Sequence, residues 1–207
     1  SNSWISVGGK IPFDPNIIFM KKDKDKKLTY FLRAAMMVLT TILIVLFLVI
    51  MSMVGKIQGT ARVVNYAGLV RGGTQRMVKL EISGAPQDKM YETISSYIEG
   101  LRNGSEKLNF VRLDDEDFQT KMDELEKYFD ELRSEILLVR EKGYENTEII
   151  EKSEKFFQIC DEAVGFAEVY SQKKATGLDH LEKIVLVDIL GLVLIIATEL
   201  IKVVRFA

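Results

Sequence analysis

The sequence predicts an all-α protein, an antiparallel four-helix bundle carried on two transmembrane helices. Two stretches of the 207-residue chain, residues 34–54 and 184–204, are long and apolar enough to cross a bilayer. Between them, apolar side chains recur at helical spacing, and glycine and proline stand where helices would end. Four amphipathic helices joined by short loops must bury their apolar faces against one another, which predicts the bundle.

Residues 1–19 differ in character from the rest of the chain. They hold two of the three prolines and show no helical period. Met20, which is followed by a run of lysines, would make a natural start, so residues 1–19 are interpreted as a leader or upstream segment outside the fold. Residues 20–33 would then be a basic cytoplasmic N-terminus.

The first apolar stretch, Ala34 to Val54, runs for 21 residues without a charge. As a helix it would measure about 31 Å, close to the roughly 30 Å of a hydrocarbon core. A soluble core helix is rarely uncharged over such a length, and a signal peptide has an apolar region of only about 7–15 residues. A transmembrane helix is therefore predicted.

The second stretch, residues 184–204, contains fifteen Leu, Ile and Val residues but also carries Asp188, Glu199 and Lys202. One charge near the middle of the membrane costs roughly 2.5–3.5 kcal/mol, which the aliphatic residues can offset, so a second span is predicted. Acids inside a membrane are functional candidates, and Asp188 and Glu199 are predicted to couple the two spans. Glu199 is expected at the depth of residues 40–41, and the alternative is that it reaches towards Lys202.

Basic residues set the expected orientation. Six lie between residue 20 and the first stretch and two lie at the end of the second, namely Lys21, Lys22, Lys24, Lys26, Lys27, Arg33, Lys202 and Arg205. The positive-inside rule then places both termini in the cytoplasm, with the chain crossing its membrane twice. Residues 55–183 would lie outside, and their 19 Lys and Arg against 25 Asp and Glu give no nucleic-acid signature. Residues 205–207 would begin a truncated cytoplasmic output region.

Turn and cap residues predict where the helices begin and end. The first helix is expected to span residues 28–82 and to end before Gly84 and Pro86. The second is expected to span residues 86–103, with Gly104 closing it.

The third helix is expected to start at the cap Asp114 and to end at Gly143. Its apolar positions have helical spacing and are Leu125, Phe129, Leu132, Ile136 and Val139. Asn146 or Thr147 should cap the fourth helix, which would run unbroken into the second span. The expected apolar face of the fourth helix comprises Ile149, Ile150, Phe156, Phe157, Cys160, Val164 and Ala167.

Two glycines lie inside the expected first helix. Gly68 and Gly72 share a face with Asn65 and Arg76, at spacings of 3, 4 and 4 residues. Each costs about 1 kcal/mol against alanine in a helix, so a close approach of another backbone is expected there. A parallel second copy of the helix would provide it, which predicts a homodimer with Gly68 and Gly72 at its interface.

Arg71 lies on the adjacent face of this helix. A homodimer would bring two Arg71 side chains together, and their planar donor forks suit a small oxyanion or carboxylate between them. The residues predicted to bind a small anion are Arg71, Asn65, Gln75 and Arg76. An alternative remains open, in which Arg71 and Arg76 pair with acids of the bundle such as Glu81 or Glu135, or are simply solvated.

The same stretch resembles a family signature. The pattern Asn-x-Ala-Gly-x-x-Arg-x-x-Thr-Gln-Arg-Met-x-Lys, from Asn65 to Lys79, is similar to the signature helix of the type IV pili methyl-accepting chemotaxis transducer N-terminal domain and to the ligand helix of nitrate/nitrite sensor kinases. In the nitrate sensors the first arginine of the pattern, one from each subunit, clamps the anion, and the resemblance carries that role to Arg71. The chain departs from the pattern at Gly72 and Gly73, where family members often have larger residues. A bulkier anion than nitrate, or no ligand, is compatible with that departure.

Proteins with such an outer domain usually continue into a cytoplasmic signalling module. Residues 199–207 are similar to the junction in membrane diguanylate cyclases, and a histidine kinase and a chemotaxis transducer are alternative outputs. The resemblance implies the sensory part of a bacterial two-component or similar receptor in the plasma (inner) membrane, which passes a helix shift across that membrane. The rival interpretation is a membrane-anchored helical scaffold or partner-binding protein that transmits nothing.

No catalytic residue, metal site or cofactor is predicted. His180 is the only histidine, and a metal site needs several ligands. Cys160 is interpreted as a small core residue, with an intermolecular disulfide as the alternative. The acids at positions 114–117 lack the spacing of a calcium loop and suit the N-terminus of a helix.

Overall fold

The computed structural model describes residues 13–206, and over these residues the protein is all-α, as predicted. The elements in order are α1 (Pro15–Ile82), α2 (Asp88–Asn103), α3 (Glu116–Lys142), the 3-10 helix η1 (Tyr144–Asn146) and α4 (Ile149–Phe206). The chain divides into two compact units, one of Ser1–Phe47 with Ile184–Ala207 and one of Leu48–Lys183. We call the first the apolar unit and the second the core unit.

Helix α1 begins at Pro15, earlier than the expected start near residue 28. Proline is favoured in the first turn of a helix because its missing N–H would have no partner there. The backbone N–H of Asn16 donates to Asp14 Oδ1 at 2.9 Å, which stabilises this start. Residues 15–19 are therefore helical, whereas residues 1–12 of the expected leader lie outside the described residues.

The apolar unit contains the first part of α1 and the last part of α4. Both helices are long and apolar enough to cross a membrane, by length and composition. Their large apolar side chains point outward, and Phe47 and Leu194 are 59 % and 68 % exposed. Gly191 of α4 lies against α1, because a Cβ built on it would be 3.4 Å from Leu39 Cδ1.

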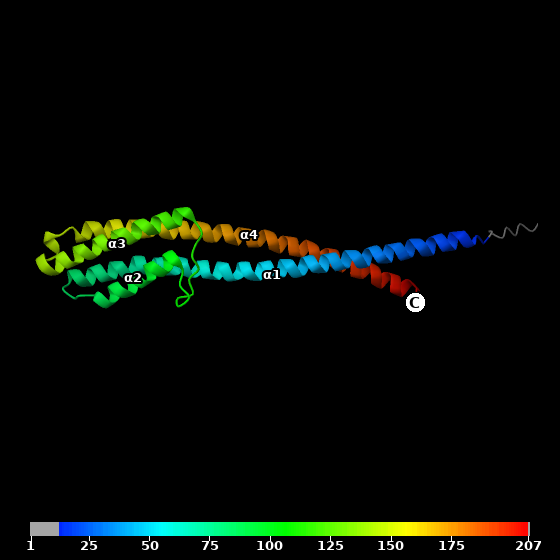
Figure 1. Cartoon of the computed structure of the whole chain (residues 1–207), viewed down its shortest axis with the longest axis horizontal. Helices are drawn as coiled ribbons and strands as arrows, with labels where there is room; N and C mark the ends of the chain where they lie inside the picture. The colour runs from blue at the N-terminus through cyan, green and yellow to red at the C-terminus, as the bar shows by residue number, and fades with distance from the viewer. Residues whose placement is uncertain (1–12, 207) are drawn as a thin grey trace, which may run out of the picture. The chain divides into compact units, whose positions relative to one another are not determined.

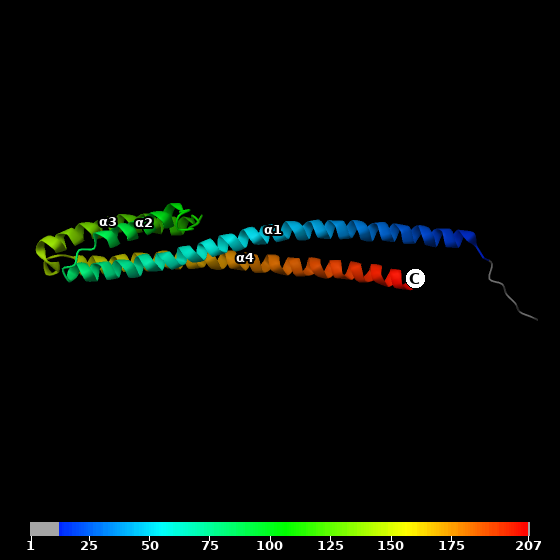
Figure 2. The ribbon, with the colours of Figure 1, turned by 90° about the horizontal axis from the view of Figure 1, so that it is seen from below.

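In the core unit the four helices lie side by side (Figure 1, Figure 2). Successive helices run in opposite directions, and aromatic contacts fix two of the pairings. Tyr66 of α1 meets Tyr97 of α2 with ring centroids 5.0 Å apart, and Tyr91 of α2 stacks on Phe129 of α3 at 4.8 Å. The largest side chains that are fully buried between the helices include Phe118, Phe156, Met77, Leu101 and Met122.

The predicted apolar face of α3 is confirmed, since all five of its residues are buried. The predicted face of α4 is only partly correct, because Ile150 and Phe157 are 57 % and 38 % exposed. Each follows a buried neighbour, Ile149 or Phe156, and successive positions on a helix point about 100° apart. The inward face of α4 instead continues through Ser153, Ile159 and Ala163.

The predicted helix ends at Gly104 and Gly143 are confirmed, and both glycines have positive φ, 83° and 80°. The predicted cap of α3 was wrong by one residue. Asp115 Oδ2 accepts the backbone N–H of Phe118 at 3.0 Å, whereas the Asp114 side chain is 98 % exposed. Four acids in a row offer several capping candidates, and only the backbone path decides between them.

The predicted caps of α4 were also wrong. The Asn146 and Thr147 side chains donate to backbone carbonyls around η1. The backbone N–H of Glu148, which precedes α4, donates to Glu135 Oε1 of α3 at 2.6 Å. A carboxylate from the neighbouring helix therefore satisfies the start of α4.

The 104–115 connection between α2 and α3 is fastened to α1. Arg62 of α1 donates from Nε and Nη2 to the Leu108 carbonyl at 3.2 and 3.0 Å. Phe110 is buried and meets the Tyr66 ring at 4.5 Å. Val111 lies over Gly59, where a side chain would have no room.

Candidate functional site

Arg71, the residue singled out by the sequence, points from α1 to α4. Its Nη1 lies 2.5 Å from Asp161 Oδ1, and its guanidinium carbon lies 5.5 Å from the centre of the Phe157 ring. The Arg71 side chain is 31 % exposed and that of Asp161 60 % exposed. Arg71 is thus paired within the chain, although with neither Glu81 nor Glu135, and solvent reaches both partners.

Gln75 lies one turn further along α1 and also bridges to α4. Its Nε2 donates to the backbone carbonyl and to Oγ of Ser153, each at 3.2 Å. Arg71 and Gln75 therefore act together, as two polar links between α1 and α4 in the core unit.

Asn65 and Arg76 lie apart from these links. Both are exposed, and within residues 13–206 no hydrogen bond of either side chain is found. They share the open face of α1 with Gly68 and Gly72, and a Cβ added at either glycine would meet nothing within 4 Å. The four predicted ligand residues thus form a pair at α4 and a pair beside the glycines.

Thr74 lies between Arg71 and Gln75 in the sequence but faces the core. It is fully buried, and its hydroxyl has no hydrogen-bond partner among the described residues. Thr60, on the same helix, shows the usual arrangement, because its hydroxyl donates to the Lys56 carbonyl at 2.8 Å. A buried polar group without a partner is costly, so Thr74 is a weak point of the packing beside the Arg71 links.

Cys160 neighbours Asp161 on α4 and is buried with a free thiol. Burial raises the pKa of the Cys160 thiol to about 12, Arg71 opposes that shift, and Asp161 adds to it. The thiol is therefore protonated at neutral pH, as expected of a core residue.

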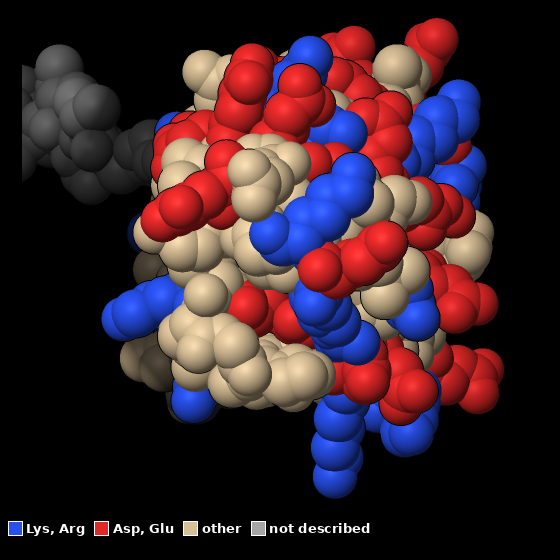
Figure 3. Space-filling view, turned by 90° about the vertical axis from the view of Figure 1, so that its left-hand side faces the viewer, with Lys and Arg blue, Asp and Glu red and all other residues tan. Residues whose placement is uncertain are grey.

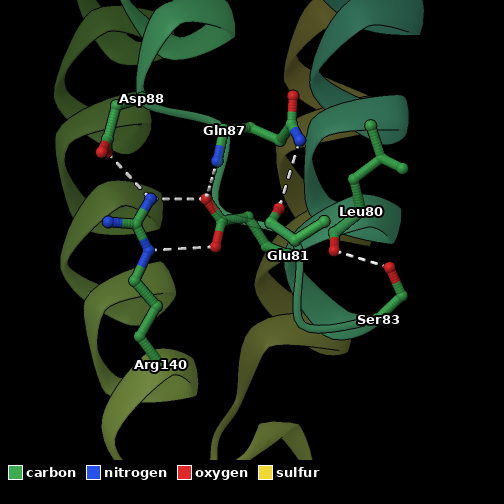
Figure 4. Close-up of polar contacts among 7 residues, drawn as sticks. Leu80, Glu81, Ser83, Gln87, Asp88 and Arg140 are labelled. Atoms are coloured by element: carbon green, nitrogen blue, oxygen red, sulfur yellow. Dashed lines mark hydrogen bonds and ion pairs between the residues drawn. The ribbon is translucent and has the colours of Figure 1, made fainter.

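Two buried carboxylates, at Glu81 and Glu135, were not identified as core residues from the sequence. Arg140 contacts both Glu81 and Asp88, and these hydrogen bonds raise its pKa (Figure 4). A cavity of about 310 Å³ adjoins the pair and is lined by loop residues such as Gly84 and Gly143. Because Glu81 and Arg140, the charged residues that line it, already pair with each other, this cavity has no unpaired charge to hold a ligand.

Around this cavity lies the end of the core unit that carries the 83–87 and 143–148 connections. Acidic and basic side chains are interspersed over its surface (Figure 3). A surface of mixed sign has little preference for anionic or cationic ligands.

Asp188 and Glu199, the predicted coupling residues, lie in the apolar unit. Asp188 is 6 % exposed, and its Oδ2 has no hydrogen-bond partner among the described residues. Glu199 lines a cleft with Thr29 and Arg33 of α1. The expected depth beside residues 40–41 was therefore wrong by about two turns, and Thr41 donates to the carbonyl of its own helix instead.

Within residues 13–206, no group of three His, Cys, Asp or Glu residues is arranged to hold a metal ion. Comparison of the chain with protein-family models, with curated proteins and with solved structures finds no match.

Proposed function

We propose that this chain is the sensory and transmembrane portion of a bacterial receptor. In this proposal residues 55–183 form an extracytoplasmic, antiparallel four-helix bundle that senses a small anion. Residues 34–54 and 184–204 span the plasma membrane, and both termini lie in the cytoplasm. The receptor works as a homodimer.

The ion pair between Arg71 and Asp161 is the observation that carries the proposal. It links the two helices that also contain the apolar segments. An exposed ion pair contributes only about 0.2–1 kcal/mol, so a small anion can compete with Asp161 for the guanidinium. The anion shifts the contact between α1 and α4 by its differential affinity for the paired and unpaired states.

The shift then passes along α1 and α4 towards a cytoplasmic output. The resemblance of residues 199–207 to the junction of membrane diguanylate cyclases favours that output over a histidine kinase or a chemotaxis transducer. Small movements of packed helices are a known means of such transmission.

Thermal unfolding of the full chain in detergent micelles tests the sensor. Nitrate, nitrite, sulfate and small carboxylates are added to the wild type, to Arg71→Ala and to Asp161→Asn. An anion present at a free concentration 100 times its dissociation constant adds about 2.7 kcal/mol to the free energy of unfolding. We expect this gain in the wild type, its loss in Arg71→Ala and tighter binding in Asp161→Asn, where the competitor is gone.

Arg133→Ala is the matched control, because Arg133 is an exposed arginine that lies 4.0 Å over the Tyr91 ring, away from the Arg71 links. It should lower the baseline stability and leave the anion response unchanged. If no anion stabilises either the wild type or Asp161→Asn, the sensor proposal fails and the helical scaffold is preferred.

A further inference from the structure

A charged cleft lies between α1 and α4 in the apolar unit, and the sensor proposal makes no use of it. Its volume is about 760 Å³. Its lining includes four cations and two acids, which are Lys22, Lys26, Arg33, Lys202, Asp25 and Glu199. The cleft therefore carries a formal excess of two positive charges (4 − 2).

The cations of α1 line one side of the cleft because of their spacing. Lys22, Lys26 and Arg33 follow one another at intervals of 4 and 7 residues, which places them on one helical face. The neighbouring Lys21 and Lys24 have the same charge but do not line the cleft. Only part of the basic segment is thus directed at one site.

Lys202 closes the cleft from α4 and is in an unfavourable state. Its Nζ is shielded from solvent and has no hydrogen-bond partner among the described residues, and the same is true of Glu199 Oε1. In the part of the chain that the structure describes, no ion pair joins the Glu199 and Lys202 side chains. The structure therefore does not contain the contact expected in the alternative, in which Glu199 reaches towards Lys202. A shielded ammonium without a partner costs several kcal/mol, which an anion beside it would offset.

The place of the cleft in the sequence indicates where that anion comes from. Arg33 immediately precedes the uncharged segment 34–54, and Lys202 lies in the last turn of segment 184–204. Tyr30, a lining residue that is 78 % exposed, is of a type enriched at the membrane–water interface. If these segments cross a bilayer, the cleft lies at the depth of the lipid phosphates.

We infer that this cleft binds the phosphate group of an anionic phospholipid. Lys202, Lys22, Lys26 and Arg33 donate to the phosphate oxygens, and the acyl chains lie along the exposed apolar side chains. Basic clefts between membrane helices commonly bind anionic headgroups in this way. The inference rests on the membrane placement within the proposed function and is independent of anion sensing.

The test uses the full chain in nanodiscs of phosphatidylcholine with a minority of phosphatidylglycerol. Native mass spectrometry of the protein released from them counts the lipids that stay bound. We expect phosphatidylglycerol to be enriched over phosphatidylcholine in the wild type. Lys22→Gln with Lys26→Gln should lower that enrichment about 30-fold, and Lys202→Gln alone should lower it several-fold.

Lys21→Gln with Lys24→Gln is the matched control, since it removes the same charge from the same helix outside the cleft. Its enrichment should stay within twofold of the wild type. An equal loss in both double variants would show diffuse attraction and overturn the site. Inorganic phosphate added to the protein in uncharged micelles separates the sources, because Lys202-dependent phosphate binding without lipid enrichment would overturn the lipid assignment.

Failure of the lipid site can be distinguished from failure of the proposed function. Flotation of the wild type with phosphatidylcholine vesicles reports membrane insertion, and Arg71→Ala reports sensing. If the protein floats with the vesicles but no phosphatidylglycerol is enriched, the lipid site alone is refuted.

Discussion

Glu81 of α1 and Arg140 of α3 form a two-point ion pair, with Arg140 Nη2 2.6 Å from Oε1 and Nε 3.0 Å from Oε2 (Figure 4). Only 2 % of the Glu81 side chain is exposed. Oε1 also accepts the backbone N–H of Gln87 at 2.8 Å, so one carboxylate ties the start of α2 to both α1 and α3. A carboxylate in so little solvent is tolerated only because all these donors face it.

We expect Glu81→Ala to lower the free energy of unfolding by about 2–3 kcal/mol, because it removes the acceptor of the Gln87 N–H and leaves Arg140 with Asp88 alone. Urea unfolding of the full chain in detergent micelles, followed by circular dichroism, measures the loss. Glu99→Ala is the control, since Glu99 is exposed on α2, and it should change stability by no more than about 0.5 kcal/mol. Equal effects of the two variants would contradict the structural role of the pair.

The cap of α3 gives a second prediction. Asp115→Ala should cost about 1 kcal/mol, because the Phe118 N–H loses its side-chain acceptor. The same change at Asp114 should be almost neutral, since that side chain is 98 % exposed. The difference between their unfolding midpoints is the measurement, and a larger loss at Asp114 would reassign the cap.

Gly59 predicts a packing effect where α1 meets the 104–115 connection. A Cβ on Gly59 would lie 2.7 Å from Val111 Cγ1, which is closer than carbon atoms approach. Gly59→Ala should therefore lose about 1 kcal/mol net, since overpacking costs about 1–3 kcal/mol and helix propensity returns about 1. Adding Val111→Ala should relieve the overpacking and recover the lost stability, which unfolding of the double variant would measure.

Gly165→Ala is the control, and its effect on the free energy of unfolding should have the opposite sign. A Cβ added to Gly165 on α4 would meet nothing within 4 Å, so alanine should stabilise the protein by about 0.5–1 kcal/mol. A gain at Gly59 comparable to that at Gly165 would mean that Val111 moves aside freely.

The helices of the core unit were predictable because residues next to their ends indicate where they stop. Gly104 and Gly143 end α2 and α3 with positive φ, and a glycine after an amphipathic stretch predicts such a helix end. The partners of charged residues were not predictable. Arg71 meets Asp161 across 90 positions of sequence and Glu81 meets Arg140 across 59, so their pairing depends on how helices pack.

Buried acids were the second feature beyond the reach of the sequence. Acidic residues are almost always exposed, so residue type assigns Glu81 and Glu135 to the surface, although both lie at helical spacing from buried neighbours. Each is buried because a donor from another element reaches it, Arg140 in one case and the Glu148 N–H in the other. The open face at Gly68 and Gly72 was predictable in part, since its glycines mark it.

Cys160 makes the stability depend on alkaline pH. The unfolded thiol ionises near its ordinary pKa of 9.0, whereas burial raises the folded pKa to about 12. The thiol's contribution is therefore complete below pH 9 and falls by about 1.4 kcal/mol per pH unit between these two values. Cys160→Ala should lack this component, so the difference between the two unfolding curves should shrink as pH rises above 9. A constant difference would contradict the raised pKa.

Gly68 and Gly72 test the proposed homodimer. Neither glycine has a neighbour within 4 Å of a built Cβ, so packing inside the chain does not explain their cost to α1. Gly68→Ala with Gly72→Ala should stabilise the isolated chain by about 1–2 kcal/mol in total. If a second copy approaches this face closely, the same change should weaken self-association in sedimentation equilibrium, whereas Gly165→Ala should leave it unchanged. Unchanged association of the double variant would remove this face of α1 from the interface, and with it the meeting of two Arg71 side chains.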